Sequence, residues 1–93
     1  MQAILVRFET NFEHDDMERG TLRFHTGLSG MPGFVMAVYT HESAEQYSAI
    51  IGWTDAKAAD EAMRTIEETV GAQPHFRNIH VSRCASFLRV QCD

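Results

Sequence analysis

The order of two kinds of apolar periodicity along the chain is the feature that most constrains its fold. Short runs rich in apolar and β-branched residues, which predict strands, lie at residues 2–10, 34–41, 46–53 and 79–91. Two longer segments repeat apolar residues every three or four positions and predict helices, one over 15–31 and one from Thr54-Asp55 to about Val70. The order is therefore β-α-β-β-α-β, in which the last segment forms one strand or a pair of short strands.

The first predicted helix carries an apolar stripe interrupted by two glycines. The stripe consists of Met17, Thr21, Phe24, Leu28 and Met31. Gly20 and Gly27 each weaken a helix by about 1 kcal/mol relative to alanine, so we expect them where backbones approach closely. The run His14-Asp15-Asp16 predicts a cap and favourable negative charge at the helix N-terminus.

The second predicted helix has clear signals at both ends. Thr54-Asp55 supplies an N-cap, and Gly71 stands where a C-terminal cap belongs. The stripe expected to be buried consists of Ala59, Met63, Ile66 and Val70, with Ala62 beside it.

This order of elements predicts an α+β fold, a ferredoxin-like βαββαβ unit in which residues 1–93 form a single domain. Both helices would cover one face of a four-stranded antiparallel sheet. The strands nevertheless carry apolar residues on both sides, which a solvated face does not favour. We therefore expect a second copy of the chain to stack on the uncovered face and form a homodimer.

Composition excludes several classes of partner and location. The formal net charge is −5, and the eight Lys and Arg residues are scattered, whereas nucleic-acid binding requires a concentrated positive face. Cys84 and Cys92 lie in one alternating segment, and in a strand they would be roughly 26 Å apart, too far for a disulfide. Free thiols and the lack of a signal peptide or membrane span predict a cytoplasmic protein.

Three local motifs resemble those of a known family. Met31-Pro32-Gly33-Phe34 joins the first helix to the second strand, and Trp53-Thr54-Asp55 closes the third strand. A small-residue run then opens the second helix, at Ala56, Ala58, Ala59 and Ala62. The turn is similar to the Pro-Gly-Phe or Pro-Gly-Tyr turn, and the strand end to the Trp-x-Asp, of the antibiotic-biosynthesis monooxygenase-like family. That family belongs to the dimeric α/β barrel superfamily, and the resemblance in element order covers nearly the whole chain.

The resemblance implies a homodimer with a shared barrel interior and a ligand cavity between each sheet and its helices. Members of the superfamily include cofactor-independent oxygenases of aromatic polyketides, haem-degrading enzymes, isomerases and proteins of unassigned activity. The haem-degrading members use an Asn on the first strand, with a Trp and a His on the second helix. Here the first strand holds Arg7 and Glu9, Asn11 stands only at its end, and the predicted second helix contains neither Trp nor His. The sequence therefore disfavours the haem-degrading branch.

Four residues are candidates for a site between helix and sheet. His25 follows Phe24 of the stripe, and an imidazole can act as a general base there. Trp53 can stack on a planar aromatic ligand, and the phenols of Tyr39 and Tyr47 can hydrogen-bond substrate oxygens. Each residue also has a structural explanation. Trp53 can be a core residue whose indole N–H finds a nearby acceptor. The two tyrosines can be ordinary half-buried strand residues, and His25 a partly exposed helix residue.

Arg7 and Arg83 form a second candidate pair, because the first and last strands are expected to be close in the sheet. Together they would clamp an anion or an enolate. The structural explanation is an Arg–Glu pair, with Glu9 as the obvious partner.

Other sequence features give weaker signals for chemistry. The spacing of His75 and His80 fits neither one face of a helix nor one face of a strand, so no metal site is predicted. Cys84 is expected to be an inert thiol, and Lys57 to lie on an exposed helical turn. The chain has no glycine-rich phosphate loop, nucleophile elbow or dinucleotide fingerprint.

Two functions follow from these observations. The first is a cofactor-independent monooxygenase of a planar aromatic or quinol-like small molecule, with His25 as base and no bound cofactor. The alternative is a non-catalytic small-molecule-binding or structural barrel protein, because the sequence holds no decisive catalytic constellation.

Overall fold

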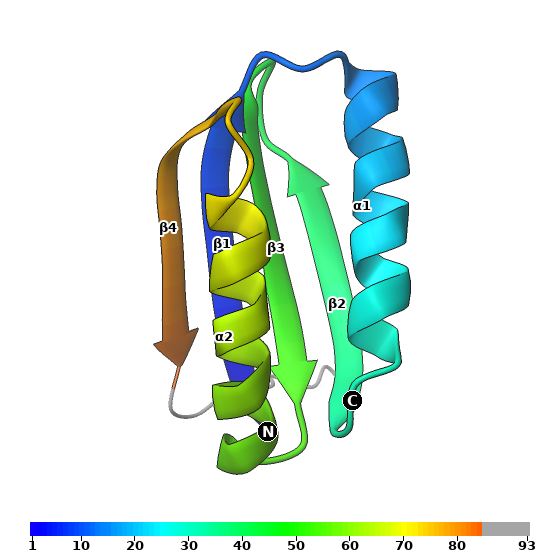
Figure 1. Ribbon diagram of the computed structural model, residues 1–93, viewed down its shortest axis with the longest axis vertical. Helices are drawn as coiled ribbons and strands as arrows, with labels where there is room; N and C mark the ends of the chain where they lie inside the picture. The colour runs from blue at the N-terminus through cyan, green and yellow to red at the C-terminus, as the bar shows by residue number, and fades with distance from the viewer. Residues whose placement is uncertain (85–93) are drawn as a thin grey trace, which may run out of the picture.

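The computed structural model describes residues 1–84 and has the predicted order of elements. The strands are β1 (Gln2–Thr10), β2 (Phe34–His41), β3 (Gln46–Trp53) and β4 (Phe76–Cys84), and the helices are α1 (His14–Ser29) and α2 (Ala56–Gly71). All neighbouring strands are antiparallel, in the order β2-β3-β1-β4 (Figure 1). The predicted ferredoxin-like βαββαβ fold is confirmed.

The last strand begins earlier than the sequence predicts. β4 starts at Phe76 rather than at Ile79, because the Phe76 ring stacks on Phe8 of β1 with centroids 4.0 Å apart. That contact extends the antiparallel pairing to Thr10 and Phe76, past a register shift between Arg7 and Glu9. The rest of the predicted strand, with Cys92, lies outside the described residues.

The helix ends differ in their capping. Asp55 caps α2 as predicted, since its carboxylate accepts a 2.9 Å hydrogen bond from the backbone N–H of Ala58. At the other end the cap is Ala72 rather than Gly71, in a right-handed conformation that needs no glycine. The N-cap of α1 is Glu13, which makes no side-chain capping bond. The cap predicted from the run His14-Asp15-Asp16 is therefore not observed. Asp15 and Asp16 lie in the first turn, where negative charge is favourable.

The glycines of α1 do not mark a close approach of backbones, so that prediction is wrong. A Cβ added at Gly20 or Gly27 would have no atom within 4 Å beyond the local helix backbone. Gly33, in the turn before β2, has the opposite surroundings: its φ is +84°, and an added Cβ would overlap the side chain of Ala58.

The core lies between the helices and one face of the sheet. Alternate residues of the two central strands face it, and Ile4, Ile51 and Trp53 are fully buried. α2 packs against β1, β3 and β4 through its small and apolar stripe, whereas α1 packs mainly against β2 (Figure 1). No helix within residues 1–84 has the length and hydropathy needed to cross a membrane.

The opposite face of the sheet has an apolar half and a polar half. Strand register places Leu5, Val38 and Ile50 in one row across the sheet, and Val38 is 46% exposed. The next row toward the C-terminal end of β1 contains Arg7, Ser48 and His80. The polar half therefore lies at the end of the sheet where β1 leads into α1. The prediction that both faces of the strands carry apolar residues is confirmed for the apolar half of this face.

Candidate functional site

The side chain of His25 meets Tyr39 where α1 crosses β2. A 2.9 Å hydrogen bond joins Nδ1 of His25 to the hydroxyl of Tyr39, and the two rings lie edge to face. The His25 ring also contacts the edge of Phe34, with centroids 5.5 Å apart. α1 therefore holds an imidazole in an aromatic layer, with a phenol as its partner.

Trp53 extends this layer toward α2. It pairs with Phe34 in the register of β2 and β3, and their rings lie edge to face with centroids 5.7 Å apart. Its indole N–H is buried without a hydrogen-bond partner in the described part of the chain. The expectation that this N–H finds a nearby acceptor is therefore wrong for residues 1–84. A buried donor without an acceptor costs free energy, and a ligand oxygen or a water molecule would remove that cost.

Tyr47 lies on the same face but belongs to a separate ring stack. Its ring is parallel to His41 at 4.4 Å and stacks on Phe8 at 5.8 Å. Its hydroxyl is also buried without a partner among the described residues. Tyr47 is therefore a core residue with a free polar group, beyond Tyr39 along the sheet rather than beside His25.

Burial disfavours ionisation of both tyrosines. Loss of solvation raises the pKa of Tyr39 and of Tyr47 above the usual 10.0. Both phenols are therefore neutral hydrogen-bond donors around neutral pH. The His25–Tyr39 pair can pass a proton from a ligand oxygen to the imidazole through the phenol.

Arg7 and Arg83 do not form the predicted clamp. β1 and β4 are neighbours as expected, but Arg83 pairs in register with Ile4 of the helix face, whereas Arg7 lies on the open face. Arg83 contacts Asp60 of α2, and Arg7 makes a 3.2 Å ion pair with Glu42 rather than with Glu9. The two guanidinium groups therefore lie on opposite sides of the sheet.

Side chains fill the layer between the helices and the sheet. Trp53 and Ile51 are 0% exposed and Tyr47 is 8% exposed. Two hollows of about 360 Å³ lie elsewhere, one on the surface of α2 around Met63 and one on the open face around Glu9. Within residues 1–84, no three His, Cys, Asp or Glu side chains gather in a way that could hold a metal ion.

The sequence interpretation missed the part played by Phe34. This ring contacts both His25 and Trp53 and so joins two of the predicted site residues. The Pro32-Gly33-Phe34 turn could have predicted this contact, because it starts β2 opposite Trp53 at the end of β3.

Comparison with family models and with curated proteins found no match. Solved structures do match over nearly the whole chain. SnoaB, a cofactor-independent oxygenase from Streptomyces nogalater, here in a mutant form, superposes with a TM-score of 0.79 at 18% identity, covering 96% of this chain and 95% of that one. The chain has the fold of this oxygenase.

Two further structures share the fold. The monooxygenase ActVA-Orf6 of Streptomyces coelicolor, in complex with nanaomycin D, gives a TM-score of 0.68 at 16% identity and covers 99% of this chain and 92% of its own. The heme-degrader MhuD of Mycobacterium tuberculosis, with two hemes bound, gives 0.64 at 14% identity, with 96% and 99% covered. The resemblance to antibiotic-biosynthesis monooxygenase-like proteins is confirmed at the level of fold, and activity has to be argued from the residues.

Proposed function

We propose that the protein is a cofactor-independent monooxygenase that acts on a planar aromatic or quinol-like small molecule. The observation that carries the proposal is the His25–Tyr39 hydrogen bond of 2.9 Å inside an aromatic layer. The buried indole N–H of Trp53, without a partner in the described residues, supplies a second polar contact for a flat ligand. The oxygenases that share the fold make this chemistry the first to test.

In the proposed reaction the substrate supplies the electrons. Tyr39 accepts the acidic proton of the substrate and at the same time donates its own proton to Nδ1 of His25. A substrate anion and an imidazolium form. The anion transfers one electron to O₂, and the two radicals combine into a peroxide anion on the substrate carbon. This anion takes the proton back from the imidazolium and becomes a hydroperoxide. The O–O bond then breaks, the terminal OH leaves with the remaining hydrogen of the same carbon as water, and one oxygen atom stays on the substrate as a carbonyl. The protein orients the ring and excludes bulk water.

Substrate entry requires side chains of the layer to move, because they fill it in this structure. α1 is the element that we propose to shift, since it packs mainly against the edge strand β2. α2, in contrast, is fixed against three strands through its fully buried Ala59, Ala62 and Ile66.

Oxygen consumption tests this function. Purified protein is mixed with an anthrone or a hydroquinone, without added flavin, metal or nicotinamide, and dissolved oxygen is followed with an electrode. His25→Ala and Tyr39→Phe should each lower the rate by about 100-fold or more, the usual contribution of a positioned acid or base. His75→Ala, which removes a histidine on the exposed loop before β4, is the matched control and should leave the rate unchanged. Absence of uptake with the unaltered protein would exclude these substrates, and equal rates in all variants would exclude His25 as the base.

One observation favours a second candidate, a non-catalytic small-molecule-binding or structural protein. The helix side of the sheet is filled by fully buried side chains, including Ile51 and Trp53. A ligand that co-purifies at one per chain and is not turned over would support the binding version. Oxygen uptake that depends on His25 would refute both versions.

We also propose that the protein acts as a homodimer through the apolar half of the open face. Val38 is 46% exposed there, in one row with Leu5 and Ile50. Native mass spectrometry should give a dimer that Val38→Lys converts to a monomer. Leu22→Lys, at a 67% exposed position on α1, is the matched control and should leave the dimer intact. A monomeric unaltered protein would refute this assembly.

A cytoplasmic location is part of the same proposal. Cys84 is a free thiol, which suits a reducing compartment. Fractionation of cells that express the protein from its own gene tests this location, and recovery in an extracellular fraction would refute it.

A further inference from the structure

A β-bulge shapes the hollow on the polar half of the open face. The pairing of β1 with β4 shifts register between Arg7 and Glu9, which leaves one extra residue in β4 at this point. Asn78 takes up the shift with a φ of +52°, in the left-handed region that asparagine tolerates better than most residues. The resulting hollow has a volume of about 360 Å³, within the range of small-molecule sites.

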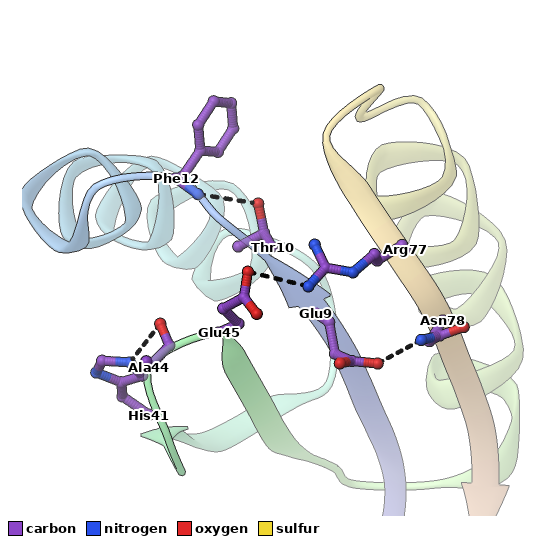
Figure 2. A network of polar contacts seen from close by, with 8 residues as sticks. All are labelled: Glu9, Thr10, Phe12, His41, Ala44, Glu45, Arg77 and Asn78. Atoms are coloured by element: carbon purple, nitrogen blue, oxygen red, sulfur yellow. Dashed lines mark hydrogen bonds and ion pairs between the residues drawn. The ribbon is translucent and has the colours of Figure 1, made fainter.

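The walls of this hollow carry one carboxylate that no cation neutralises. Arg7 pairs with Glu42, and on β4 Arg77 pairs with Glu45 at 3.0 Å. Glu9 instead accepts a hydrogen bond from the neutral side-chain amide of Asn78, beside the Arg77–Glu45 pair (Figure 2). Arg7 and His80 also line the hollow, but Arg7 is paired with Glu42. Glu9 makes no ion pair with any described residue, so it adds one negative charge beside two ion pairs that are neutral overall, and the local charge favours a cation.

Further hydrogen-bond acceptors surround Glu9. Because the Asn78 amide nitrogen donates to Glu9, its carbonyl oxygen is left as an acceptor. Gln46 of β3 lines the same hollow and carries a second amide carbonyl. An ammonium group has three N–H donors in a pyramidal arrangement, which suits one carboxylate and two carbonyls. A metal ion fits less well, since no group of three ionisable ligands exists among residues 1–84.

We propose that this hollow binds a small organic ammonium, with Glu9 as its counter-ion and Asn78 and Gln46 as acceptors. The site lies on the opposite face of the sheet from His25 and does not depend on the oxygenase function. It also lies outside the apolar row that we assign to the dimer contact.

The test is a titration of isotope-labelled protein, followed by amide chemical shifts in NMR spectra. The probes are propylammonium chloride and, as an uncharged molecule of similar size, propanol, both in buffer of constant ionic strength. Propylammonium should cause saturable shifts in β1 and β4 around Glu9, with a dissociation constant in the millimolar range expected for so small a ligand. Propanol should cause none.

Variants distinguish the site from general attraction to an acidic protein. Glu9→Gln should weaken binding by about tenfold or more, because a charge-assisted hydrogen bond is lost. Glu61→Gln removes the same charge from an exposed position on α2 and should leave affinity unchanged. Asn78→Gly keeps the left-handed backbone, removes one acceptor and should weaken binding severalfold. Equal shifts with propanol, equal effects of both glutamate substitutions, or no saturable shift near Glu9 would each overturn the proposal.

Discussion

Replacing the two glycines of α1 by alanine should stabilise the protein. Gly20 and Gly27 lie inside the helix, and an added Cβ meets no atom within 4 Å beyond the helix's own nearby backbone. Glycine costs a helix interior about 1 kcal/mol relative to alanine, so the double variant should gain about 2 kcal/mol. At about 4–8 °C per kcal/mol for a domain of this size, the melting temperature should rise by about 8–16 °C.

The assay is urea unfolding followed by far-ultraviolet circular dichroism, at one fixed protein concentration. Gly33→Ala is the opposing control: its positive φ and the overlap with Ala58 predict a loss of stability. If Gly20→Ala and Gly27→Ala destabilise the protein, the space beside α1 is occupied, and the packing described for this helix is wrong. No change in either direction would refute the helix-propensity argument.

Two further predictions concern capping and ionisation. Asp55→Ala should lower the free energy of unfolding by about 1 kcal/mol, because the bond to the Ala58 N–H that caps α2 is lost, and urea unfolding measures this. Burial raises the pKa of Tyr39 and Tyr47, so above pH 10.0 the unfolded chain releases phenolic protons that the folded chain keeps. The free energy of unfolding should therefore fall as the pH rises past 10.0. The fall should be smaller in the Tyr39→Phe variant, which lacks one of the two phenols. A flat profile between pH 10 and the raised pKa would contradict the burial of these phenols.

Periodicity in the sequence predicts the local elements well. The first three strands match the predicted ranges, because these features depend on which residues one face must cover. The predicted α2 stripe is buried at Ala59, Ile66 and Val70, whereas Met63 is only half-buried. β4 starts earlier than predicted because a contact distant in sequence, Phe76 on Phe8, extends it. Helical spacing alone does not reveal what lies beside Gly20 or Gly27.

The candidate site is predicted only in part. His25, Tyr39 and Trp53 lie on the helix side as expected, and a hydrogen bond joins the first two. The Arg7 and Arg83 clamp fails because the register of β1 and β4, which the sequence does not reveal, pairs Arg83 with Ile4 and so places the two arginines on opposite faces. Partners of charged side chains are equally hard to predict: Arg7 of β1 pairs with Glu42 in the connection between β2 and β3 rather than with Glu9 of its own strand.

Trp53 allows the most direct test of the central claim that a planar molecule binds between α1 and the sheet. It is the only tryptophan in the chain, and it is fully buried in that layer. Its fluorescence is followed while an anthrone or a hydroquinone is added without oxygen, so that no turnover occurs, with free tryptophan as the optical control. Saturable quenching at one ligand per chain, weakened in Tyr39→Phe, is the predicted result. Emission that changes no more than that of free tryptophan would contradict the site.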